Sequence, residues 1–323
     1  MYCMQNLLAS VLASAINVLP GSVAEGFVWG ILTIGVFISF KVLNVADMSV
    51  EGTLALGGTV TAAMTVAGVP IWLTMLVAVL CGAASGAITA IMHTKLKIPA
   101  ILAGILTMFA LYSVNIHVLG NRASLALLNK PTLKYLFMRS FGATSIIADI
   151  VISGLFVACS LGIIYLFFKT RAGYSVRATG CNPAMARAQG INTDRDIIVA
   201  LAISNGLAAL SGSLLAQINT GATANMGTGA IVIGLAGVVL GEAVTRESFP
   251  FGAKLAAVIL GSVIYRVVLS LAIQLVTFLT MDDLKLISAV IILAVLAAKR
   301  FAPKHKKGKK RQPEVSGGGA EGV

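Results

Sequence analysis

The sequence predicts an all-α, polytopic membrane protein with about nine or ten transmembrane helices. Of the 323 residues, 58% are hydrophobic and only 11% are charged, and the mean hydropathy is +0.94. About a quarter of the residues of a soluble domain are charged, so this chain has too few charges to cover a surface that faces water. A spanning helix needs roughly 20 mainly apolar residues, which leaves room for about ten spans.

Ten apolar runs follow one another along the chain. They cover residues 4–19, 24–40, 52–68, 70–92, 98–119, 145–168, 196–218, 227–241, 252–275 and 284–298. The first run lacks the positive flank of a signal peptide, so we interpret it as an uncharged span or an interfacial helix. The chain has ten membrane spans if this run crosses the membrane, and nine if it lies on the surface. Two GxxxG pairs, at 82–86 and 237–241, predict close contacts between helices.

The basic residues predict the orientation, because lysine and arginine favour the cytoplasmic side. Eight of them lie in 299–311, five in 169–195 and two in the turn after residue 93. An even number of spans separates these segments, so all three can be cytoplasmic, and with them the C-terminus. The loop 120–144 carries four basic residues and would lie outside, against the rule. The basic tail, 301–323, is expected to be disordered and to lie beside anionic lipid, not nucleic acid.

The residue types that carry chemistry are scattered. The four cysteines and three histidines form no metal-ligand spacing, and the chain has no G-x-x-x-x-G-K-[ST] phosphate-binding loop. We therefore expect no metal, no cofactor, no enzymatic activity and no nucleotide hydrolysis of that kind in this chain. An intramembrane enzyme is disfavoured for the same reason. A self-powered secondary transporter or channel stays open as an alternative.

One short polar segment, "GCNPAMARAQG" at 180–190, stands between apolar runs. Asn182 is a good N-cap, Pro183 suits the first helical position, and Gly190 can take the left-handed conformation that ends a helix. The segment therefore predicts a helix of about two turns. Because such a short helix is marginal by itself in water, we expect a soluble partner to support it.

This segment resembles the permease subunits of ATP-binding-cassette importers, in the branch with branched-chain amino-acid and ribose permeases. The matching residues are Arg177, Gly180, Asn182, Pro183, Ala186, Gly190, Ile191 and Asn192. Earlier, Asp47, Ser49 and Val50 match the D-L-S-V-G segment of the branch, although Met48 replaces Leu and Glu51 is inserted before Gly52. The blocks "HTKLKIPAILAGILTMFALYS" and "DDLKLIS" are most similar to the uncharacterised and tryptophan/tyrosine-type importers.

The resemblance implies a type II importer-like permease domain over 1–300, with a cytoplasmic coupling loop at 169–195. It implies that 183–189 is a coupling helix set in a cytoplasmic ATPase dimer, with Arg177, Gly180, Asn182, Pro183, Ala186, Arg187 and Gly190 as coupling residues. It further implies a second permease copy, an external solute-binding lipoprotein and a bacterial cell membrane. The implied solute is an amino acid of aromatic type, with a sugar, a nucleoside or a vitamin precursor as alternatives.

Polar residues inside the apolar runs are candidates for the substrate path, because charge within lipid is costly. Arg266 can bind a substrate carboxylate, or form an ion pair with Asp149, Glu242 or Glu51. Asp47 and Glu51 are four residues apart and would share a helix face, near Ser49. Asp47 and Glu51 either line the substrate path at an interfacial position or a break in a helix, or lie at the solvated start of a helix. Asn115 can bind substrate or hydrogen-bond between helices.

Overall fold

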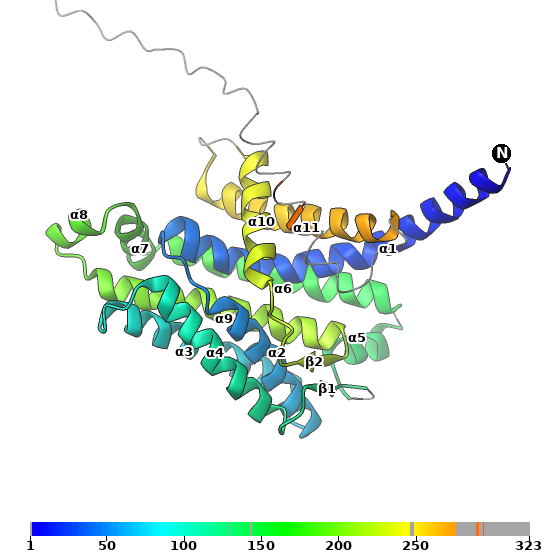
Figure 1. Ribbon diagram of the computed structural model, residues 1–323, viewed down its shortest axis with the longest axis horizontal. Coiled ribbons are helices and arrows are strands. Elements are labelled where there is room, and N and C mark those ends of the chain that lie inside the picture. Colours follow the sequence, from blue (N-terminus) through cyan, green and yellow to red (C-terminus); the bar gives the residue numbers. More distant parts are fainter. Residues whose placement is uncertain are drawn as a thin grey trace, which may run out of the picture.

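The computed structural model describes residues 2–128, 130–142, 144–245, 249–275, 289–290 and 293, with side chains from residue 18 to 273 within these ranges and at the last three positions. The α-helices are α1 (Tyr2–Val36), α2 (Val50–Val66), α3 (Ile71–Thr94), α4 (Ala100–Val118), α5 (Leu133–Phe141), α6 (Ser145–Phe168), α7 (Arg171–Cys181), α8 (Pro183–Ala188), α9 (Thr193–Ile218), α10 (Ala230–Val244) and α11 (Phe251–Leu275). The long helices run roughly along one axis of the bundle, and α10 crosses them steeply (Figure 1).

Two ends of the bundle can be told apart. Helices α7 and α8 project at one end, which we call the α8 end (Figure 1). At the opposite end, which we call the sheet end, β1 (Ser124–Ala126) pairs antiparallel with β2 (Gly221–Thr223), and Leu125 lies opposite Ala222. This short ladder ties the connection after α4 to the connection after α9, so the sheet end is closed by backbone hydrogen bonds.

Six helices of the described chain are long and apolar enough to cross a membrane: Val18–Val42, Ile71–Thr94, Ala100–Val118, Ser145–Phe168, Thr193–Ile218 and Phe251–Ile273. The chain is therefore a multi-pass, helical membrane protein. Helices α2 and α10 coincide with two more of the expected runs, but they have only 17 and 15 residues. Both are short because each begins partway through the bundle.

The first two apolar runs, 4–19 and 24–40, are not separate helices. Helix α1 continues through Pro20 for 35 residues. Pro20 has no amide hydrogen and so removes one hydrogen bond from the helix, which transmembrane helices tolerate. The expected last run, 284–298, and the tail, 301–323, lie outside the described residues apart from three positions.

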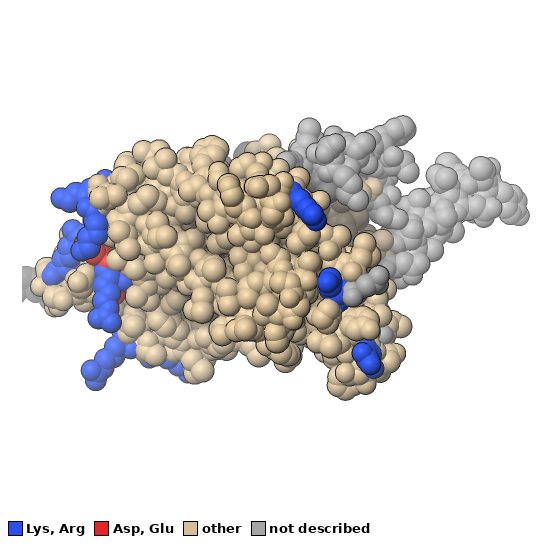
Figure 2. Space-filling model, turned by 90° about the horizontal axis from the view of Figure 1, so that it is seen from below, with Lys and Arg blue, Asp and Glu red and all other residues tan. Residues whose placement is uncertain are grey.

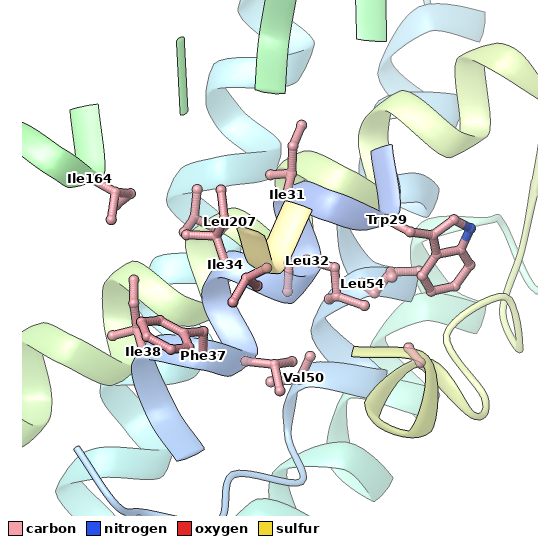
Figure 3. Close-up of a cluster of buried hydrophobic side chains, with 14 of the residues drawn as sticks. Trp29, Ile31, Leu32, Ile34, Phe37, Ile38, Val50, Leu54, Ile164 and Leu207 are labelled. Atoms are coloured by element: carbon pink, nitrogen blue, oxygen red, sulfur yellow. The ribbon is translucent and has the colours of Figure 1, made fainter. Parts of the chain in front are cut away.

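The second half of α1 is the centre of the molecule. Trp29, Ile31, Leu32 and Ile34 are buried and belong to one apolar cluster with Leu207 of α9 and Ile164 of α6. Figure 3 shows Trp29 beside Leu54 of α2. After Val36 the helix widens into a π-helical turn, η1 (Phe37–Val42). Residues 43–49 are not helical, so the chain breaks there before α2 begins.

Helices α2, α3 and α9 meet backbone to backbone at glycines. A Cβ added to Gly57 would lie 2.0 Å from the Ala209 carbonyl oxygen, and one on Gly212 would lie 1.9 Å from that of Leu54. A Cβ on Gly86 would lie 2.3 Å from the carbonyl oxygen of Leu201. The other GxxxG pair behaves alike, because Gly241 packs on Ala257 of α11. Close packing at both pairs is confirmed.

Candidate functional site

The short helix α8 has the predicted caps. The Asn182 side chain accepts a hydrogen bond from the Met185 amide at 3.1 Å, and Pro183 opens the helix. Gly190 has φ +78°, in the left-handed region. Its amide donates to the carbonyl of Arg187 at 3.0 Å. Helix α8 therefore ends at a sharp turn that leads directly to α9.

Little of the protein covers α8. Within Pro183–Ala188 only Ala186 is buried, while Met185 keeps 63% of its surface exposed. Arg187 lies along the start of α9, where its Nε donates to the hydroxyl of Thr193 at 2.7 Å. Helix α8 is thus held at its ends and presents most of its surface outward.

Helix α7 anchors α8 to the bundle. The Thr179 hydroxyl donates to the Asp196 carboxylate of α9 at 2.8 Å, and that of Ser175 donates to the same carboxylate oxygen. Gly180 lies so close to η1 that an added Cβ would be 1.8 Å from the Val42 carbonyl oxygen. The α7–α8 arm therefore contacts the end of η1 through backbone atoms, with no side chain between them.

The α8 end is strongly basic. Figure 2 shows lysines and arginines gathered at this end, and only a few at the other. Two of the three basic segments that the sequence places together lie within the described residues, and their exposed basic residues are Lys95, Lys97, Lys169, Arg171, Arg177, Arg187 and Arg195. The structure thus brings the turn after α3 and the α7–α9 segment to the same end of the bundle.

Asp47 lies in the break between η1 and α2, not on a helix. One carboxylate oxygen accepts from the Ser49 amide at 2.9 Å and from the Ser49 hydroxyl, and the other accepts from Asn205 Nδ2 of α9 at 2.7 Å. Asp47 and Ser49 are fully buried. The expectation that Asp47 and Glu51 share a helix face is wrong, because the helix begins only at Val50.

Glu51 lies where the starts of two short helices meet. It is in the first turn of α2, and its Oε1 accepts from the amide of Gly229, the N-cap of α10, at 3.0 Å. A Cβ on Gly227 would lie 1.9 Å from the Glu51 carbonyl oxygen. Gly52 packs against Met108, about halfway along α4. The two helix starts therefore meet near the middle of the bundle.

A pocket of about 270 Å³ opens beside this meeting point. Glu51, Asn115, Phe109 and Tyr112 line it, together with Ala224, Asn225, Gly227 and Thr228 of the chain before α10. Asn115 also bonds between helices, because its Nδ2 donates to the Gly52 carbonyl at 3.3 Å. Of the residues predicted for a substrate path, the structure brings Glu51 and Asn115 together here. Asp47, Ser49 and Arg266 are not among its lining residues.

Arg266 of α11 forms an ion pair with Glu25 of α1, through both its Nε and a terminal nitrogen. The prediction that Arg266 would pair with Asp149, Glu242 or Glu51 is wrong. Asp149 pairs with Lys134 at 2.7 Å and Glu242 pairs with Lys41 at 2.6 Å, while Glu51 is at the pocket. Glu25 lies 241 positions from Arg266 in the sequence, so no local pattern indicates this pair.

Comparisons with known proteins decide the family. Residues 19–296 match the family model described as "Branched-chain amino acid transport system / permease component". The chain belongs to this permease family. It is a permease subunit of the ATP-binding-cassette type, and the family consists of transport subunits.

Individual relatives agree with the family. The permease is 37% identical to the tyrosine transport system permease protein of Clostridioides difficile over 84% of this chain and 88% of that protein. It is 28% identical to the uncharacterized protein RP368 of Rickettsia prowazekii, over 87% and 98%. It is also 28% identical to the ribose import permease RbsC of Escherichia coli K12 over 60% of each chain.

A solved structure supports the fold alone. The permease superimposes on a chain of PsaBC from Streptococcus pneumoniae, solved in complex with a Fab, with a TM-score of 0.51 and 16% sequence identity. The match covers 88% of this chain and 95% of the other.

The sequence did not predict Phe109 and Tyr112 as pocket residues. Aromatic residues that line a pocket within a span have the same sequence pattern as aromatic residues that face lipid.

Proposed function

We propose that the permease works in an importer and that α8 is its coupling helix. Helix α8 is capped at both ends and mostly exposed, as a helix seated in another subunit would be. It also lies at the basic end of the bundle, which the positive-inside rule assigns to the cytoplasm. A cytoplasmic ATPase dimer would contact Met185 and its neighbours, and ATP hydrolysis would take place in that partner.

We propose an amino acid, of aromatic type, as the solute, and the pocket beside Glu51 as part of its path. The pocket offers complementary groups to two parts of such a molecule. The Glu51 carboxylate would attract the ammonium group through a charge-assisted hydrogen bond. Phe109 and Tyr112 would lie against an aromatic ring. This combination in one pocket is the observation that carries the proposal.

The relatives support the same solute class, since the tyrosine transport permease is similar over most of both chains. A sugar is the second candidate, because ribose import permeases are also relatives. The remaining parts of the proposed assembly are an external solute-binding lipoprotein and a second copy of the permease in a bacterial cell membrane. Two copies would enclose the path between them, since Phe109 and Tyr112 are 65% and 44% exposed on the outer face of α4.

The test is uptake into proteoliposomes that hold the permease, its ATPase and its binding protein. We expect ATP-dependent uptake of labelled L-tyrosine that unlabelled L-tyrosine and L-tryptophan compete for and D-ribose does not. Glu51→Gln should lower this uptake at least tenfold while leaving the amount of assembled complex unchanged. Competition by D-ribose alone would overturn the amino-acid assignment. Accumulation of L-tyrosine by vesicles that hold the permease without any ATPase would favour a secondary transporter.

A further inference from the structure

A second, larger pocket lies at the α8 end, far from the Glu51 pocket. It has a volume of about 480 Å³ and opens between η1, α7, α10 and α11. Three basic side chains from three different elements line it: Lys41 of η1, Arg177 of α7 and Lys254 of α11. One acidic side chain, Glu242 of α10, is also present. The described lining therefore carries more positive than negative charge.

The basic groups differ in how they are paired. Lys41 is paired with Glu242 at 2.6 Å. For Arg177 and Lys254, no carboxylate of the described residues comes within 4.0 Å. The Arg177 guanidinium lies over the Phe251 ring, 4.9 Å from its centroid. Stacking on the ring holds the guanidinium in place and leaves the N–H groups at its edge able to bind an anion.

The level of this pocket along the spanning helices indicates what it can bind. The candidate span Val18–Val42 ends at one wall of the pocket, and the candidate span Phe251–Ile273 begins at another. The pocket thus lies at the level where spanning helices leave the membrane, which is the level of lipid headgroups. Apart from Thr245, its remaining lining residues are apolar or weakly polar and include Phe37, whose ring is 6.1 Å from that of Phe251. An acyl chain can lie against such a wall.

We infer that this pocket binds the phosphate of an anionic phospholipid headgroup. Arginine and lysine are the side chains that bind phosphate through charge-assisted hydrogen bonds. Basic pockets between membrane helices on the cytoplasmic side are suited to such headgroups. The bound lipid would bridge α7, which carries α8, to α11. It is therefore a structural ligand of the α8 end, independent of the solute and of the Glu51 pocket.

The experiment titrates dioleoylphosphatidylglycerol into the detergent-purified permease and counts bound lipid by native mass spectrometry. We expect tighter binding than for dioleoylphosphatidylcholine. The double substitution Arg177→Gln/Lys254→Gln should weaken the apparent affinity for phosphatidylglycerol by about tenfold or more. The control Lys97→Gln/Arg195→Gln removes the same charge from exposed positions at the same end, outside this pocket, and should bind as the unaltered protein does.

Two further measurements keep the inference testable. Arg177→Lys/Lys254→Arg keeps both charges and should bind phosphatidylglycerol within about threefold of the unaltered protein. Cys181 is exposed and lines the pocket, so bound phosphatidylglycerol should slow its labelling by a maleimide. Equal weakening in both glutamine variants would overturn the site, because the effect would then be one of net charge. Equal protection of Cys181 by inorganic phosphate would overturn the lipid assignment.

Discussion

At the scale of single residues, Gly180 is the most constrained position of the α8 end. Its Cα lies directly against the Val42 carbonyl, where an added Cβ would be 1.8 Å away. No rotamer change relieves this contact, because both atoms belong to the backbone. The α7–α8 arm and the end of η1 must therefore separate if any side chain is introduced at Gly180.

We predict that Gly180→Ala abolishes ATP-driven uptake while the protein still inserts. Overpacking of this kind costs roughly 1–3 kcal/mol and is met by backbone shifts, which would displace α8 from its partner. Uptake into proteoliposomes and detergent-extracted yield are the two measurements. Gly162→Ala is the control, since Gly162 on α6 has no heavy atom within 4 Å of an added Cβ. Unchanged uptake by Gly180→Ala would contradict the role of this contact.

The Glu25–Arg266 pair is the other residue-scale feature with a clear consequence. The side chains of Glu25 and Arg266 are 27% and 23% exposed, so either charge would be poorly solvated without its partner. Removing one partner of a buried pair costs up to about 3–5 kcal/mol, whereas replacing both with apolar residues is often neutral.

We therefore predict that Arg266→Ala lowers the thermal stability of the purified protein and that Glu25→Leu/Arg266→Met restores it. Both stability and L-tyrosine uptake should be measured. Uptake that recovers together with stability would identify Arg266 as structural. Uptake that stays lost in a stable double variant would instead support a contact between Arg266 and the solute.

At the scale of elements, α8 is a short helix whose limits are set locally. Proline at position 190 requires φ near −65° and has no amide hydrogen, whereas Gly190 has φ +78° and donates to Arg187. We predict that Gly190→Pro, like deletion of 183–189, leaves insertion intact and abolishes ATP-driven uptake. Asn182→Ala removes only the N-cap, at a cost of about 1 kcal/mol, and should lower uptake partially. Normal uptake after the deletion would rule out a coupling role.

Elements differ in how far the sequence predicts them. The caps of α8 and the two GxxxG contacts follow from neighbouring residues, and these predictions were confirmed. The break at 43–49 lies in the gap between the expected runs 24–40 and 52–68, and a broken helix was one of the two alternatives for Asp47. Its limits did not follow, because "NVADMSV" has no glycine or proline to mark them. The depth at which α2 and α10 begin did not follow either, since hydropathy gives the length of an apolar run and not its position along a neighbouring helix.

At the scale of the whole molecule, the fold class followed from composition, but the pairing of distant charges did not. Arg266 was expected to meet one of three acidic residues, and its partner is a fourth, Glu25, from the far end of the chain. The pocket beside Glu51 is lined by α2, α4 and the segment before α10, which only tertiary packing can bring together. Glu51 and Asn115 were singled out for their polarity alone, and the aromatic wall beside them needed the structure.

The glycine contacts among α2, α3 and α9 have a consequence for how the permease can move. The close backbone contacts at Gly57, Gly86 and Gly212 leave little room for sliding, and side-chain hydrogen bonds between Thr53 and Ser85 and from Thr61 to Ser213 cross the same seam. We therefore expect the three helices to travel as one block. Helix α6 is different, because Gly154 and Gly162 have open space or only distant contacts around them. Any rocking that exposes the solute first to one side and then to the other would therefore be accommodated at the periphery, while the central trio keeps its shape.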